Sequence, residues 1–294
     1  MAKTIGIMLT EGIEAGVVED NALVGPTSHY PANRSETDAL VEKPHEALVE
    51  LLCDRILDIA EGHGDIVSVG VGVPGLVRHG VVEEAPNLPQ LKGAKIQQAV
   101  SFALHERGFD TNVKTVNDAD AMAAGLAAQF GKLDRMIRVW TLGRGIGYGR
   151  YPFVDGVWEG GHMVVTLDDK ERYCGCGGRG HLEGIMGLRA MRMRFLDLEP
   201  EEVFEMAEKG DERCLQFKKL WHKALAAATA SSVHMTGPGK FYLTGTNTRY
   251  IDLPMLENYV HQMVTMSPLQ SFSIEVVKDS AGTAVRGAGI VAGM

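Results

Sequence analysis

Four potential metal ligands lie within one short, glycine-rich part of the sequence. They are His162, Cys174, Cys176 and His181, and the glycines between them let the chain fold tightly around a small ion. Two thiolates and two imidazoles form the closed tetrahedral set that Zn²⁺ takes in structural sites. The alternative is a surface loop with two free thiols, which would be open to oxidation. We therefore predict a structural zinc with no open position for a water nucleophile.

A second candidate site residue is Asp118, which follows a short apolar run. Val113–Val116 reads as a buried strand that ends at Asn117-Asp118, and functional groups of α/β folds gather beyond the carboxyl ends of strands. On residue type alone, Asp118 is best interpreted as the N-cap of a helix over 119–130, a common role for aspartate. A cap and a site residue are compatible, so the sequence leaves both roles open.

Apolar, strand-like runs alternate with segments of helical periodicity along the chain. The expected strands cover residues 4–9, 15–18, 66–73, 113–116, 136–142, 146–153, 240–243 and 274–277. The expected helices cover residues 38–61, 95–107, 119–130, 183–195, 200–209, 211–235, a segment from 253, and 281–292. This alternation is typical of α/β proteins. We predict a small α/β domain, 1–118, completed by the C-terminal helix 281–294, and a large α/β domain, 119–280, that carries the metal-binding loop.

The composition is that of an acidic globular protein. The chain has 294 residues, of which 45% are hydrophobic, and a formal net charge of -9. An acidic chain repels phosphate backbones, so nucleic acid is a poor candidate partner and we expect none. No apolar run approaches the length that spans a bilayer, so we expect no membrane partner either. No signal peptide precedes the first strand, so we expect a cytoplasmic protein. In that compartment Cys53 and Cys214 are expected to be buried thiols rather than disulfide partners.

The cysteine-containing segment resembles the signature of the ROK sugar kinases, E-x-G-H followed by C-x-C-G-x-x-G-C-x-E. Residues 159–162 read E-G-G-H and residues 174–183 read C-G-C-G-G-R-G-H-L-E, so His181 stands where the family usually has a third cysteine. Further segments resemble family motifs over nearly the whole chain: residues 71–75, 86–89, 116–121, 142–147 and 281–288. The resemblance implies a two-domain actin-like, hexokinase-like (ASKHA) α/β fold with an interdomain cleft.

The resemblance also implies a reaction, in which a sugar hydroxyl attacks the γ-phosphate of Mg-ATP and an aspartate takes the hydroxyl proton. Asp118 matches that base, and a carboxylate suits an alcohol whose proton leaves late. The implied substrate is a hexose or hexosamine, and we expect a homodimer. The residues implied to contact the sugar are Asn117, Asp118, Glu159, His162 and Glu183. Those implied to contact the nucleotide are Gly143, Arg144, Gly145 and Gly245.

The phosphate-binding motifs depart from the family pattern. Residues 8–12 read M-L-T-E-G where the family has roughly D-[IL]-G-G-T, so Met8 replaces an aspartate that helps to organise Mg²⁺, and Glu11 adds negative charge. Arg144 replaces a threonine and either grips a phosphate or blocks it. Near Gly245 the family tends to have two glycines. Two hypotheses follow: a kinase with an unusual phosphoryl donor, which we favour, or a sugar-binding pseudokinase that acts as a sensor or partner.

Overall fold

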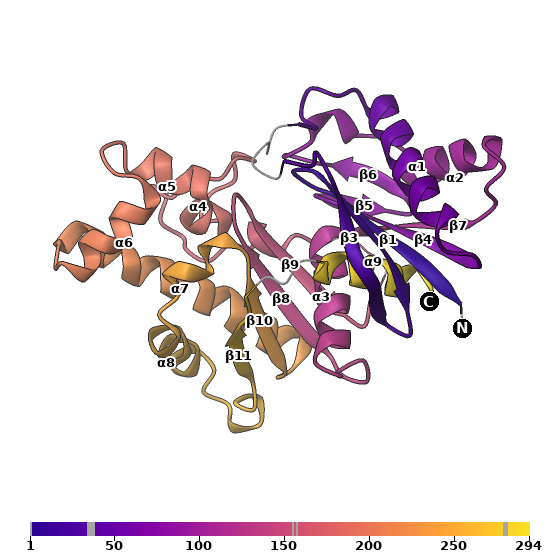
Figure 1. The fold of residues 1–294 in the computed structure, drawn as a ribbon. Helices are drawn as coiled ribbons and strands as arrows, with labels where there is room; N and C mark the ends of the chain where they lie inside the picture. Colours follow the sequence, from indigo (N-terminus) through magenta and orange to yellow (C-terminus); the bar gives the residue numbers. More distant parts are fainter. Residues whose placement is uncertain (1, 34–38, 155, 157, 279–281) are drawn as a thin grey trace. The chain divides into compact units, whose positions relative to one another are not determined.

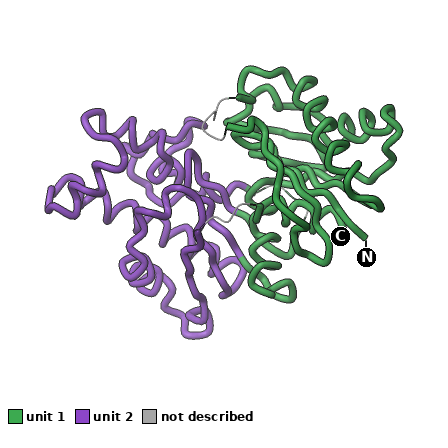
Figure 2. Tube along the Cα trace, viewed as in Figure 1, with its two compact units in different colours: residues 1–137, 149–158, 280–294 green, residues 138–148, 159–279 purple. Residues whose placement is uncertain are grey.

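The structure is a computed structural model that describes residues 2–33, 39–154, 156, 158–278 and 282–294 (Figure 1). The chain forms two compact units (Figure 2). The first unit contains residues 1–137, 149–158 and 280–294, and the second contains residues 138–148 and 159–279. The sequence predicts a domain boundary directly after Asp118. In the structure, the helix that follows Asp118 belongs to the first unit.

The first unit is built on a five-stranded sheet with the strand order β3-β2-β1-β4-β7. The strands are β1 (Lys3–Leu9), β2 (Ile13–Glu19), β3 (Ala22–Tyr30), β4 (Ile66–Val73) and β7 (Asn112–Asn117). The first three pair antiparallel, and β1, β4 and β7 run parallel, so the carboxyl ends of these three meet at one edge of the sheet. A separate hairpin of β5 (Leu76–Arg78) and β6 (Val81–Glu84) follows β4.

Helices cover both faces of this sheet: α1 (His45–Glu61) and α2 (Ile96–Glu106) one face, α3 (Asp118–Gln129) and α9 (Thr283–Ala292) the other (Figure 1). Helices α3 and α9 pack very closely. The absence of a side chain on Gly287 allows this, because a Cβ there would collide with the carbonyl oxygen of Ala121. The first helix was predicted over 38–61; residue 38 lies outside the described residues, and residues 39–44 are not helical, so α1 begins later, at His45. Pro44 precedes the helix with extended dihedrals, and proline also disfavours helical geometry in the residue before it, Lys43.

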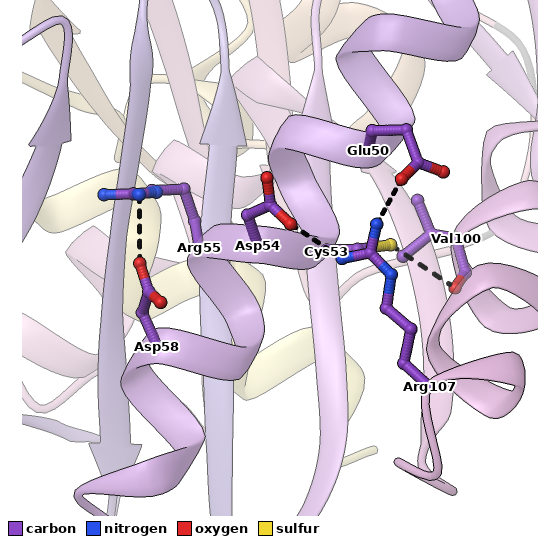
Figure 3. Close-up of polar contacts among 7 residues, drawn as sticks. All are labelled: Glu50, Cys53, Asp54, Arg55, Asp58, Val100 and Arg107. Atoms are coloured by element: carbon purple, nitrogen blue, oxygen red, sulfur yellow. Dashed lines mark hydrogen bonds and ion pairs between the residues drawn. The ribbon is translucent and has the colours of Figure 1, made fainter.

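Side chains from α1 and the end of α2 connect these two helices (Figure 3). The Arg107 guanidinium donates to Asp54 Oδ1 at 2.7 Å and also to Glu50. The thiol of Cys53 donates to the carbonyl oxygen of Val100 at 3.9 Å, and burial raises the pKa of Cys53 to about 11. A thiol held protonated in this way is a poor nucleophile, and the prediction of a buried thiol at this position is confirmed.

The second unit contains a four-stranded sheet with the order β11-β10-β8-β9. Its strands are β8 (Ile137–Leu142), β9 (Ile146–Tyr151), β10 (Lys240–Thr244) and β11 (Ser273–Val276). The first residue of β8 and the last three residues of β9 belong to the first unit. Its helices are α4 (Glu183–Met186), α5 (Leu188–Arg194), α6 (Pro200–Glu208), α7 (Glu212–Thr236) and α8 (Leu253–Met263). The single helix predicted over 183–195 is wrong, because the extended backbone of Gly187 separates α4 from α5. Cys214 on α7 is buried, as predicted.

Long helix α7 passes through the core of this unit, where Trp221 is fully buried, and packs against α6 and α8. Across the described part of the chain, no helix combines the length and apolar character needed to cross a membrane.

Candidate functional site

The four predicted metal ligands lie together in the second unit. One ligand atom from each of His162, Cys174, Cys176 and His181 lies within 4.8 Å of the other three. The Sγ atoms of the two cysteines are 3.3 Å apart, and Cys176 Sγ is 3.3 Å from His181 Nδ1. Tetrahedral Zn²⁺ with bonds of about 2.0–2.3 Å places its ligand atoms roughly 3.3–3.8 Å apart. The donor set and its spacing therefore fit zinc after small side-chain movements.

Backbone pairing holds the ends of this cysteine-containing loop side by side. Val164 and His181 form an isolated antiparallel bridge, and the N–H of Val165 donates to the carbonyl oxygen of Gly180 at 2.8 Å. The loop is also joined to α5, since Glu171 accepts two hydrogen bonds from the fork of Arg194 and is only 8% exposed. A bidentate, buried pair of this kind fixes orientation, so the ligands are held by the protein itself.

The electrostatics of the cluster favour bound positive charge. The side chains of Cys174 and Glu183 raise the pKa of His162 to about 11. Burial acts to raise the pKa of Cys174, but hydrogen bonds with His162 and Cys176 outweigh it and lower that pKa. Without a metal, the hydrogen bonds within the cluster thus favour the charged forms of both His162 and Cys174. A divalent cation can take the place of the proton on His162, because metal binding requires deprotonated ligands.

Glu183, the first residue of α4, is the predicted sugar ligand that the structure places beside the metal cluster. Its Oε1 is 3.8 Å from His162 Nε2, and its Oε2 accepts a hydrogen bond from the N–H of Ile146 at 2.9 Å. Burial acts to raise its pKa, but His162 and the Ile146 N–H outweigh that effect and lower the pKa. The carboxylate is therefore ionised and oriented, as recognition of sugar hydroxyls requires.

Glu159 stands at the entry to the short 3₁₀ turn Gly160–His162. Its carbonyl oxygen accepts a hydrogen bond from the N–H of His162 at 3.0 Å. The second unit therefore carries Glu159, His162 and Glu183 on adjoining segments.

The remaining two predicted sugar ligands, Asn117 and Asp118, lie in the first unit where β7 ends and α3 begins. Asn117 caps α3: its Oδ1 accepts from the N–H groups of Ala119 and Asp120 at 2.9 and 3.3 Å, and its Nδ2 donates to the carbonyl oxygen of Gly75 at 2.7 Å. The interpretation of Asp118 as the cap is therefore wrong. Asp118 is the first helical residue, and burial raises its pKa to about 6, the direction expected for a poised base.

The loop Gly143–Gly145 lies in the second unit between β8 and β9. The N–H of Gly143 donates to the carbonyl oxygen of Gly145 at 3.0 Å, and Arg144 at the tip is exposed. Fully buried Asn247, which the sequence did not point to, donates through Nδ2 to Gly143 O at 2.9 Å. Asn247 lies two residues after Gly245, whose φ of +97° is one that glycine adopts readily. The predicted nucleotide-binding residues of this unit thus lie on two neighbouring turns.

The first phosphate motif lies at the end of β1 and does not fit the metal that it was expected to organise. Met8 is 4% exposed, and its thioether fills the space beside Gly72 on β4. Mg²⁺ takes oxygen ligands in octahedral geometry, and a buried thioether offers none. In the following turn the N–H of Thr10 donates to Gly12 O at 2.9 Å, and Glu11 is exposed.

The mixed first sheet with helices on both faces and the second, smaller sheet define a two-domain α/β protein of the actin-like, hexokinase-like (ASKHA) class. A solved ROK hexokinase from Thermus thermophilus has this fold, with a TM-score of 0.79 over 99% of this chain and 97% of that one at 22% identity. Residues 6–293 match the ROK family. The chain belongs to the ROK family, which confirms both the predicted fold class and the resemblance noted in the sequence.

Two curated relatives are similar over part of the chain. A glucokinase from Pyrobaculum calidifontis is 29% identical over 197 residues, 62% of this chain and 63% of the relative. An N-acetylmannosamine kinase from Haemophilus influenzae is 31% identical over 206 residues, 66% of this chain and 65% of the relative. The chain thus matches just under two thirds of the length of each of these relatives.

Proposed function

We propose that this protein is a sugar kinase that transfers a phosphoryl group to a hydroxyl of a hexose or hexosamine. The curated relatives are named for glucose and N-acetylmannosamine, which are sugars of these two kinds. The observation that carries the proposal is the half-buried carboxylate of Asp118, whose pKa is raised to about 6 at the start of α3. The homodimer and the cytoplasmic location stay predictions.

In this proposal Asp118 accepts the proton of the attacking sugar hydroxyl. A base with a pKa near the working pH is both largely deprotonated and able to take the proton. The transition state of phosphoryl transfer is loose, so most of the catalysis comes from positioning and from charge stabilisation. Asn117, Glu159, His162 and Glu183 bind the sugar hydroxyls through oriented hydrogen bonds.

A structural zinc held by His162, Cys174, Cys176 and His181 would fix the imidazole that faces Glu183. A closed set of four protein ligands leaves no coordination position for water or substrate. Such a site would add to the folding energy and would not place a Lewis acid at the reacting atoms. His162 would then act in the reaction through its fixed position.

A second candidate function is supported by the buried thioether of Met8. A sugar-binding pseudokinase would keep the sugar ligands and lose the residue that organises Mg²⁺. Arg144 supports the opposite hypothesis, because its guanidinium fork matches phosphate geometry. These two residues make the identity of the phosphoryl donor the central question about this protein.

A coupled kinase assay over a panel of hexoses and hexosamines, with ATP, GTP and inorganic polyphosphate as donors, tests the proposal. Calorimetry with the same sugars measures binding separately from transfer. Transfer to at least one sugar supports the kinase, and sugar binding without transfer from any donor supports the pseudokinase. If no sugar binds at millimolar concentration and none is phosphorylated, both candidate functions are wrong.

We expect Glu183→Ala to weaken sugar binding by roughly 1–3 kcal/mol, the range for losing a hydrogen bond to a charged group. The carboxylate is ionised and held by His162 and the Ile146 N–H. Its oxygens are therefore fixed in position to accept further hydrogen bonds from sugar hydroxyls. Calorimetry with the best sugar measures the effect. Glu205→Ala, which removes an exposed carboxylate 3.9 Å from Lys209, is the control and should bind sugar like the wild type. An unchanged affinity in Glu183→Ala would exclude Glu183 from the sugar site.

We expect the triple change Met8→Asp, Thr10→Gly and Glu11→Gly to raise the affinity for MgATP and any transfer rate. The change supplies an oxygen ligand for the metal at position 8, removes the negative charge of Glu11 and gives the turn the glycines that let backbone N–H groups approach a phosphate closely. Nucleotide titrations of the wild type, of Glu11→Gly alone and of the triple variant separate the effect of charge from that of the metal ligand. A wild type that already uses MgATP at about 1–100 per second, as ordinary kinases do, would show that these departures are harmless.

A further inference from the structure

Asp120 is a buried carboxylate in the first unit to which the proposed reaction assigns no role. It lies on the first turn of α3, two residues after Asp118, and is 3% exposed. Its Oδ1 accepts a hydrogen bond from the backbone N–H of Arg150 at 2.9 Å. Burying a carboxylate is costly unless hydrogen bonds compensate, and here burial raises the pKa of Asp120 to about 7 although Arg150 and Trp158 act against it.

The chain segment that Asp120 contacts crosses directly over the first turn of α3. A Cβ on Gly149 would collide with the carbonyl oxygen of Ala119 and lie 2.8 Å from the N–H nitrogen of Asp120. The backbone therefore approaches this turn as closely as only glycine allows. Arg150 follows Gly149 in the chain, and Asp120 fixes it by accepting the hydrogen bond from its backbone N–H.

The far end of the same segment is bound to the same carboxylate. The side chain of Trp158 hydrogen-bonds Asp120, and the Arg150 guanidinium lies over the Trp158 ring, 3.8 Å from its centroid. Cation–π stacking at this distance adds to the hydrogen bonds. Asp120 thus joins both Arg150 and Trp158 to the turn that begins with Asp118.

The next residue in the chain after Trp158 is Glu159, a proposed sugar ligand. We propose that Asp120 is a positioning residue for phosphoryl transfer: it holds the segment that leads into Glu159 against the helical turn that carries the base Asp118. The inference rests on the proposed function, because it concerns how two of its residues are placed. Asp120 acts through these neighbours and is assigned no contact with the sugar.

The test compares Asp120→Ala with Asp120→Asn. Misplacing reacting groups by about 1 Å costs up to roughly 100-fold in rate, so in Asp120→Ala we expect kcat to fall and the sugar KM to rise, with kcat/KM lower by about 10–100-fold. The amide oxygen of Asp120→Asn still accepts from the Arg150 N–H, so this variant should recover most of the loss. Asp54→Ala is the control, because it removes an exposed carboxylate paired with Arg107, and should match the wild type.

Calorimetric sugar binding provides a second readout that does not depend on the phosphoryl donor. We expect Asp120→Ala to bind the best sugar about tenfold more weakly, since Glu159 loses its placement. A wild type that neither binds nor phosphorylates a sugar overturns the proposed function itself. A functional wild type together with a folded Asp120→Ala of unchanged kcat, KM and sugar affinity overturns only the inference.

Should Asp120→Ala fail to fold, Trp158→Phe takes its place. Phenylalanine keeps a ring for the Arg150 guanidinium but removes the indole N–H that bonds Asp120. We expect a loss in the same direction, about threefold or more in kcat/KM, the factor for one weak hydrogen bond. Unchanged kinetics and unchanged sugar affinity in a folded Trp158→Phe would overturn the inference.

Discussion

The substitution Asp118→Asn is expected to reduce phosphoryl transfer by roughly 10²–10⁴-fold, the usual contribution of a general base, and to leave sugar affinity within a few-fold. The amide keeps the shape of the side chain but cannot accept the hydroxyl proton. Helix α3 is not endangered, since Asn117 provides its cap through hydrogen bonds of 2.9 and 3.3 Å. Steady-state kinetics with the best sugar and donor, together with calorimetry, separate the two effects.

The pH dependence gives a second measurement of the same role. Burial raises the pKa of Asp118 from 3.8 to about 6, and the base works only when deprotonated, so kcat/KM of the wild type should fall as pH drops below about 6. The residual activity of Asp118→Asn should lack this acid limb.

The contribution of Asp118 to stability should change with pH in the opposite direction to its contribution to activity. A carboxyl whose pKa is raised by folding binds more protons folded than unfolded between about pH 4 and 6, so its contribution to stability decreases as pH rises through that window. Asp118→Asn removes this penalty and should melt at or above the wild-type temperature at pH 7. Asp54→Asn controls for the loss of a carboxylate. An Asp118→Asn variant with wild-type kcat would show that the base is another group.

The second large effect is expected for the cysteine-containing loop. Cys176→Ser should lose zinc and lower the free energy of unfolding by several kcal/mol, because metal binding free energy is largely folding free energy in such sites. Elemental analysis of the purified protein should give near one zinc per chain in the wild type and almost none in the variant. Sugar affinity should fall as well, since His162 and Glu183 lie against this cluster with a 3.8 Å contact.

Cys214→Ser is the matched control for this substitution. Cys214 is buried at the start of α7, so its replacement by serine also costs stability, but it should leave the zinc content unchanged. Chelation of the wild type should reproduce the effect of Cys176→Ser. A wild-type protein that contains no metal and melts at the same temperature with and without added zinc would contradict the assignment.

Much of the fold could be predicted because its central strands are continuous apolar runs. The run Ile66–Val73, which becomes β4, is buried on both faces over residues 68–73 and is a continuous apolar segment that predicts a strand. The edge strand β3 (Ala22–Tyr30) could not be predicted, because it is largely exposed and contains Gly25 and Pro26, residues that are typical of turns and tolerated at sheet edges. The break at Gly187 was missed since one glycine inside a helical pattern is often tolerated.

The candidate site also has parts that the sequence predicts and parts that it does not. The types of the four metal ligands and the glycines between them predict a metal site, and the structure brings all four ligands together. The link between Asp120 and Arg150 and the contact of Asn247 with Gly143 join residues far apart in the chain. No local spacing predicts such contacts. The cap at Asn117 was missed because asparagine and aspartate are equally good caps, and only geometry separates adjacent candidates.

The two oxygens of Glu183 have a consequence for engineering this protein. One lies towards His162 and the other holds the N–H of Ile146, immediately after the loop Gly143–Gly145. A library that varies residue 183 to admit a new acceptor would therefore also reshape the turn expected to receive the donor. Changes in acceptor preference and in donor use would be inseparable in such variants. Selectivity is better redesigned at Glu159, with residue 183 kept constant.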